Sequence, residues 1–142
     1  MVELPAFVPA MDPIPTVVRD LLERLVAADV VMFSTPEYAG GLPGALKNML
    51  DWTVGGGELY GKLVAWLDVS NPGRGEGARA QLRTVLGYVG ARIIEAACTH
   101  VVLPTDGDDP AALATADKQL GIASAAIIAA VKDDSHGRHS HR

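Results

Sequence analysis

The chain has 142 residues, the usual length of one domain, and its 49% hydrophobic and 20% charged residues are ordinary for a globular protein. A net charge of −5 without a cluster of lysines or arginines argues against nucleic acid as the main partner, because binding to phosphates requires a basic patch. The single cysteine excludes an internal disulfide, and the sequence shows neither an apolar run of membrane-spanning length nor a signal-peptide pattern. We therefore expect a cytoplasmic protein with a small-molecule partner.

Helix and strand patterns alternate along the chain. Residues 16–28 carry apolar side chains at helical spacing, and the apolar run of residues 30–33 is typical of a strand buried on both faces. The later elements expected from the same patterns are a helix at 43–52, a strand at 63–67, a helix at 78–88, a strand at 93–97 with a longer alternative to 103, and a helix at 110–131. This order predicts an α/β fold with a doubly wound, mostly parallel sheet and helices on both faces.

The end of the chain differs from the rest. Residues 132–142 are polar and hold all but one of the four histidines, so we predict one domain over residues 1–131 and a disordered tail over residues 132–142. His100 has no partner at metal-ligand spacing, and three histidines on a flexible tail are normally not a functional site. The aspartates at 106, 108 and 109 lack the calcium-loop pattern. We expect no metal site, and a solvated turn at those aspartates.

Two glycine-rich loops follow predicted strands, at the edge where open parallel sheets bind ligands. The first reads Thr-Pro-Glu-Tyr-Ala-Gly-Gly-Leu-Pro-Gly over residues 35–44. Its glycines allow the backbone to approach a flat ring, and its prolines stiffen it. A connector with ordinary turn chemistry fits the same residues equally well.

The second loop, residues 70–77, allows two interpretations. A dinucleotide-binding pattern, G-x-G-x-x-A, is formed by Gly73, Gly75 and Ala78. Glu95 follows at about the distance of the acid in that pattern, but it lies inside a predicted strand instead of at a strand end. Pro72 and Arg74 are also awkward in the tight turn, which weakens this interpretation. The other interpretation, which we prefer, is a second loop that contacts the same ring as the first, and it is the one that a family resemblance implies.

The run TPEYAGGLPGALKNMLDW at residues 35–52 resembles TPEYNGSIPGVLKNALDW of the NADPH-dependent FMN reductase family, and the resemblance extends from near Leu4 to near Val102. It implies a flavodoxin-like fold, FMN and NADPH as cofactors, and a homo-oligomer. The flavin contacts that it implies in the first loop are Pro36, Glu37, Tyr38, Ala39 and Gly40. Ser70 and Gly73 would lie near the ring edge, and Arg74 would meet the phosphates of the nicotinamide nucleotide.

Two departures from the family matter. Ala39 stands where many members have asparagine, so a side-chain hydrogen bond is lost there. The segment at residues 4–9 resembles a linker that follows the family's second strand, so this sequence is expected to begin after the first strand, the phosphate loop, a helix and the second strand. The strand at residues 30–33 should then lie at a sheet edge and favour association, and FMN should bind weakly.

The function implied by the resemblance is hydride transfer from NAD(P)H to FMN and then electron transfer to a quinone or a free flavin. No side chain is assigned a catalytic role, because the flavin performs the chemistry. Lys47 and Asp51 have the spacing of a helical ion pair, and Cys98 lies in an apolar stretch typical of an inert thiol. Two alternatives stay open: a flavodoxin-like remnant or interaction module without FMN, and a nucleotide binder that uses the second loop.

Overall fold

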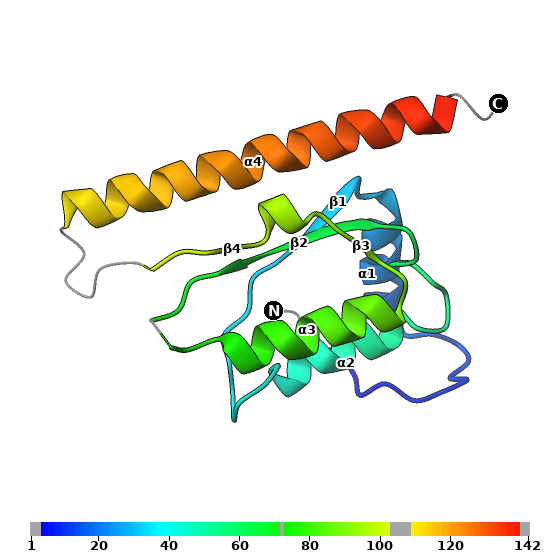
Figure 1. Cartoon of the computed structure of the whole chain (residues 1–142). Coiled ribbons are helices and arrows are strands. Elements are labelled where there is room, and N and C mark those ends of the chain that lie inside the picture. The colour runs from blue at the N-terminus through cyan, green and yellow to red at the C-terminus, as the bar shows by residue number, and fades with distance from the viewer. Residues whose placement is uncertain (1–3, 72, 103–108, 140–142) are drawn as a thin grey trace.

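The computed structural model describes residues 4–71, 73–102 and 109–139, and it confirms the predicted α/β fold with a parallel sheet (Figure 1). The elements in chain order are α1 (Thr16–Ala27), β1 (Val30–Phe33), α2 (Gly44–Trp52), β2 (Leu63–Asp68), α3 (Glu76–Tyr88), β3 (Arg92–Ile93), the 3-10 turn η1 (Glu95–Ala97), β4 (Thr99–His100) and α4 (Pro110–His139). Of the expected solvated turn, Asp106 and Asp108 lie outside the described residues.

β2 is the central strand of the sheet and has parallel partners along both of its edges. On one side it pairs with β1, in a register that runs from Val30↔Leu63 to Phe33↔Trp66. On the other side β3 pairs with its first half and β4 with its second half. Among the described residues, β1 therefore ends the sheet on its side, which agrees with the expected edge position.

The 3-10 turn η1 interrupts what the sequence predicts as one strand over residues 93–97. Leu63 pairs with Arg92, and Leu67 pairs with Thr99. The two paired positions are four residues apart in β2 but seven residues apart in the partner segment. Three extra residues must therefore be taken up between β3 and β4. The prediction of a continuous strand is wrong at this point.

The physical reason lies in the sequence Glu-Ala-Ala and in the helix above it. Alanine and glutamate have low strand propensity, so little is lost when they leave the sheet. In the turn, Ala97 becomes fully buried against Ala65 of β2 and Ala123 of α4. The backbone stays paired, because the Ala97 N–H donates to the carbonyl oxygen of Ile94 at 2.8 Å.

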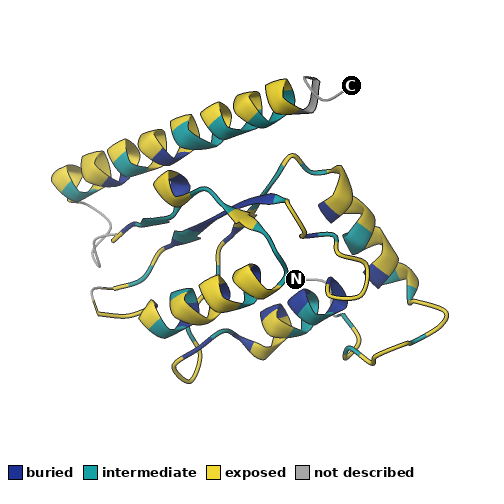
Figure 2. Ribbon diagram, turned by 45° about the vertical axis from the view of Figure 1, so that its right-hand side comes forward, coloured by how far each residue is buried: buried dark blue, intermediate teal, exposed yellow. Residues whose placement is uncertain are grey.

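The two faces of the sheet carry different helices. On one face, Val64 and Trp66 of β2 pack against buried leucines from α1, α2 and α3 in the larger core. On the other face, Ala65 packs beneath α4 in a smaller core of alanines. Figures 1 and 2 show the sheet between these layers, with the buried β2 at its centre and exposed residues on the outer surfaces of the helices.

β1 is covered on one face only. Phe33 is buried in the larger core, but Met32 is 44% exposed. Met32 pairs with Ala65, so both lie on the face that α4 covers at β2. The prediction of a strand buried on both faces at residues 30–33 is therefore wrong, whereas β2 is buried on both faces.

α4 continues through His139, where the sequence predicts disorder from residue 132. Arg92 of β3 forms an ion pair with Asp134, which ties the last turns of the helix to the sheet. The side chains of Ser135 and His136 also bond to carbonyl oxygens one turn earlier. The prediction of a disordered tail is thus wrong up to residue 139, because it considered burial and overlooked the partner at Arg92. Among the described residues, no helix is both long and apolar enough to cross a membrane.

The segment before α1 is held by α2. The Asn48 side chain accepts a hydrogen bond from the Phe7 N–H at 2.7 Å and donates one to the carbonyl oxygen of Pro5 at 3.0 Å. The Trp52 indole N–H donates to the same oxygen at 3.0 Å, and its ring meets the Phe7 ring edge-on at 5.1 Å. Asn48 and Trp52 therefore fix the segment that enters the fold before α1.

We predict that Asn48→Ala lowers the free energy of unfolding by about 1–3 kcal/mol, because two hydrogen bonds are lost, one of them partly buried. The neighbouring Lys47→Ala is the control. It removes only the exposed ion pair of Lys47 with Asp51, 2.6 Å long, and should cost at most about 0.5 kcal/mol. Urea unfolding of both variants tests this, and equal losses would show that Asn48 does not hold the segment.

Candidate functional site

The loop after β1 contains a tight turn of four residues. The Tyr38 and Gly41 backbones exchange two hydrogen bonds, each 3.0 Å long, and both central residues have positive φ, 50° at Ala39 and 76° at Gly40. These angles are those of a type I′ turn, which asparagine and glycine favour. Tyr38, Ala39 and Gly40 are exposed, so the turn presents its backbone at the surface.

The loop after β2 is folded upon itself. The Ser70 hydroxyl donates to the Arg74 carbonyl oxygen at 3.0 Å, and the His100 ring nitrogen Nε2 lies 2.8 Å from the Ser70 carbonyl oxygen, to which it can donate. Gly73 has a φ of 77° with open space beside it. The Ser70 side chain thus shapes the loop, while Gly73 and Arg74 are exposed.

Three contacts join the first loop to the start of α3. Glu37 Oε2 accepts a hydrogen bond from the Ala78 N–H at 3.1 Å, and Gln81 Oε1 accepts one from the Leu42 N–H at 2.8 Å. Between them, Gly77 lies so close that a Cβ atom on it would be 2.1 Å from the carbonyl oxygen of Gly40. The turn is therefore attached to α3 on both sides.

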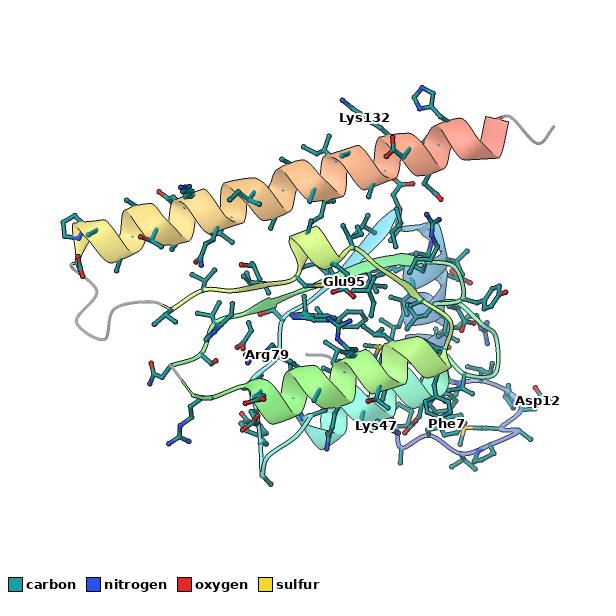
Figure 3. The ribbon with its side chains drawn as sticks, viewed as in Figure 1. Phe7, Asp12, Lys47, Arg79, Glu95 and Lys132 are labelled. Atoms are coloured by element: carbon teal, nitrogen blue, oxygen red, sulfur yellow. The ribbon has the colours of Figure 1, made fainter. Side chains whose placement is uncertain are left out.

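A buried acid lies beneath the second loop. Asp68, the last residue of β2, is only 6% exposed and forms an ion pair with Arg79 of α3. Figure 3 labels the Arg79 side chain. A Cβ atom on Gly75 would lie 2.5 Å from Asp68 Oδ2, so the loop passes directly over this pair. Sequence reasoning missed both residues. The signal was available, because a charged residue that ends a buried strand needs a partner.

An open groove of about 500 Å³ lies beside α3, η1 and β4. Arg83 lies with its guanidinium carbon 4.9 Å from the Trp66 ring centroid and makes two bonds to Glu95, 2.6 and 2.8 Å long. Arg83 thereby lowers the pKa of the Glu95 carboxyl, and burial raises the pKa of the nearby Cys98 thiol. The raised pKa fits the inert thiol expected at Cys98. None of the residues predicted to contact the flavin lines this groove.

The structure brings the two predicted loops together through α3, whose first turn follows the second loop and contacts the first. Two of the side chains predicted to contact the flavin form hydrogen bonds within the protein instead. The Glu37 carboxylate bonds to α3, and the Ser70 hydroxyl bonds within its own loop. The dinucleotide-binding interpretation loses support, because Glu95 is bound by Arg83 and lies in η1.

Comparison with known proteins identifies the family. The profile of the NADPH-dependent FMN reductases matches residues 2–102. The chain belongs to this family. The match includes both strand-end loops and the α3 residues that join them.

Several relatives resemble the chain in sequence. A quinone reductase of Escherichia coli is 38% identical over 84 residues, which are 56% of this chain and 44% of that protein. An NAD(P)H-dependent FMN reductase of Pseudomonas aeruginosa is 42% identical over 79 residues, 53% of this chain and 42% of that protein. The chain thus spans less than half the length of these relatives.

Solved structures show the same fold over a larger share of the chain. The flavoenzyme NAD(P)H:(acceptor) oxidoreductase FerB of Paracoccus denitrificans superposes with a TM-score of 0.67 and 27% identity, covering 88% of this chain and 74% of that one. A WrbA-like flavodoxin of Agrobacterium tumefaciens has a TM-score of 0.55 at 21% identity, covering 75% of this chain and 71% of that one, which supports the flavodoxin-like fold alone.

The two loops expose backbone and apolar ring surface at the carboxyl ends of β1 and β2. Neither Gly40 nor Gly73 has an atom within 4 Å of the position that a Cβ would take, so a flat group can reach both backbones. The exposed Tyr38 adds apolar ring surface beside them. Backbone donors and apolar surface are the groups that a neutral, planar ring system requires.

We predict that Ala39→Gly raises the free energy of unfolding by about 1 kcal/mol, because alanine pays a steric penalty in the left-handed region that glycine avoids. Ala39→Asn should also raise the free energy of unfolding, but by less, since asparagine tolerates positive φ. Thermal unfolding of the two variants measures the effect. A loss of stability in both would mean that the turn is not type I′.

Gly77→Ala should lower stability by about 1–3 kcal/mol, although glycine-to-alanine changes in helices normally stabilise by about 0.5–1 kcal/mol. The added methyl group would meet the fixed Gly40 carbonyl oxygen. Gly87→Ala, in the same helix with open space beside it, is the matched control and should be neutral or stabilising. If both variants gained stability in urea unfolding, the turn would not contact α3 as described.

Proposed function

We propose that this protein is an NAD(P)H-dependent FMN oxidoreductase that passes electrons to a small acceptor, a quinone or a flavin. The observation that carries the proposal is the pair of exposed backbone turns at Gly40 and Gly73, held together by α3 at the carboxyl ends of β1 and β2. Ligands of open parallel sheets bind at this edge. Membership of the FMN reductase family supports the same assignment.

In this proposal the ring of FMN lies against the first loop at Pro36, Tyr38, Ala39 and Gly40, and its edge lies near Ser70 and Gly73. Bound FMN supplies the hydride chemistry, and the protein supplies orientation. Ala39 has no polar side-chain atom, so its contribution is its backbone. Gly40 must keep its positive φ for the turn to present that backbone.

Arg74 is the residue that we assign to the nicotinamide nucleotide. Its backbone N–H donates to the Asn71 carbonyl oxygen at 3.0 Å and its own carbonyl oxygen accepts from the Ser70 hydroxyl, so Arg74 holds the loop through its backbone groups. The guanidinium is exposed at the rim of the second loop and suits a phosphate, which it can bind with two parallel hydrogen bonds. A cytoplasmic location, expected from the single cysteine, and a homo-oligomeric state, implied by the family resemblance, complete the proposal.

The test is a titration of the isotope-labelled chain with FMN to millimolar concentration, followed by nuclear magnetic resonance. The backbone amide signals of Tyr38, Gly40 and Gly73 should shift, while those of Gly121 on the far layer should not. NADPH oxidation in the presence of a quinone should then depend on both FMN and the protein. Millimolar flavin is used so that weak binding is still detected.

Two outcomes would contradict the proposal. Shifts confined to Arg83 and Thr99 would locate the ring in the groove beside η1. Shifts at the loops without any NADPH oxidation would favour a flavin-binding module without catalytic activity.

A further inference from the structure

Glu37 caps a helix that lies far from it in sequence. α3 begins after Gly75, which has no side chain to accept a hydrogen bond from the first turn. The carboxylate of Glu37 takes this role, with Oε2 3.1 Å from the N–H of Ala78, the third residue of the helix. An acidic group at a helix N-terminus is also favoured by the helix dipole.

The same residue stands at the entrance of the exposed turn. Tyr38 and Gly41 are the two residues that close the turn. Glu37 directly precedes Tyr38, and Leu42 directly follows Gly41. The Leu42 N–H is bonded to Gln81, one helical turn beyond Ala78. Both ends of the turn are therefore fixed to consecutive turns of one helix.

The contact between Gly40 and Gly77 makes this attachment rigid. The turn lies against α3 with no room for a methyl group, so it cannot move toward the helix. Glu37 and Gln81 prevent it from moving away. The position of the turn relative to the second loop is thus set by α3, because that loop ends at Gly75, the residue before the helix.

We propose that Glu37 is a positioning residue for the flavin: its carboxylate, acting through the first turn of α3, holds the Tyr38–Gly41 turn at the distance from the second loop that the ring requires. The proposal rests on the proposed function. It differs from the contact role implied by the family resemblance, because the side chain is directed to the helix and only the backbone remains for the ligand. A shift of the turn by a fraction of an ångström would weaken ring binding without unfolding the protein.

The experiment compares Glu37→Ala, Glu37→Gln and Glu23→Gln. Glu37→Ala removes the acceptor, whereas Glu37→Gln keeps an acceptor oxygen without the charge. Glu23→Gln makes the same charge change at an exposed site on α1 and is the control. Two quantities are measured on each full chain: hydrogen exchange of the Ala78 and Leu42 amides, and FMN affinity from the amide shifts of Tyr38 and Gly40.

In Glu37→Ala, exchange at Ala78 should rise about fivefold, as expected for a lost helix cap, and FMN affinity should fall about tenfold. Glu37→Gln should restore affinity to within about threefold of the original chain, since amide oxygens also accept backbone hydrogen bonds. Glu23→Gln should change neither quantity. Urea midpoints recorded in parallel verify that every variant is folded at the temperature of the titration.

The outcomes separate this proposal from the proposed function. Unchanged exchange at Ala78 in Glu37→Ala would show that the cap is absent and would overturn the positioning role. Faster exchange with unchanged FMN affinity would make Glu37 a helix cap only, which overturns the positioning role and leaves flavin binding intact. If the original chain showed no loop shifts with FMN, the proposed function and the positioning role would both fail, while exchange would still report whether the cap exists.

Discussion

The hydrogen bond from the Ala78 amide to the Glu37 carboxylate is the contact on which the arrangement of the site depends. β1 and β2 are adjacent, but their loops leave the sheet separately and could diverge. α3 prevents this, because its first turn continues directly from the second loop and binds the first. The Glu37 carboxylate thus gives a partner to an N–H group that has none within the helix, and it also fixes a loop that has no regular secondary structure.

Small residues make this contact possible. Gly77 allows the helix to approach the Gly40 carbonyl oxygen, and Gly75 allows the loop to pass over the buried Asp68. Asp68 in turn needs Arg79, because a buried carboxylate without a partner would cost several kcal/mol. Glycines in such loops are usually explained by the close approach of a ligand. Here Gly75 and Gly77 allow protein segments to pack closely against one another as well. Gly40 and Gly73 are the two whose open surroundings favour a ligand.

Much of the fold could be predicted from the sequence, because alternation of helical and strand periodicity is strong from Thr16 to Tyr88. The errors fall where tertiary contacts decide. Residues 95–97 leave the sheet because Ala97 is buried under α4, and residues 132–139 are helical where Arg92 provides a partner for Asp134. In the candidate site, the two loops were evident from their glycines and strand-end positions. Gln81, Asp68 and Arg79 were not, since their partners are distant in sequence.

Because the candidate site exposes mainly backbone groups, its geometry depends on residues that lie behind its surface. The exposed face of the first loop offers peptide groups and the Tyr38 ring, so alanine can occupy position 39 despite the local strain of its positive φ. Apart from Glu37 in the first loop, the side chains that define the geometry lie behind the loops: Gln81 and Arg79 on α3, and Asp68 at the end of β2. For this reason, a change at Gly77 or Gln81, which face the loops from behind, should alter ligand geometry more than a conservative change on the exposed surface of the turn.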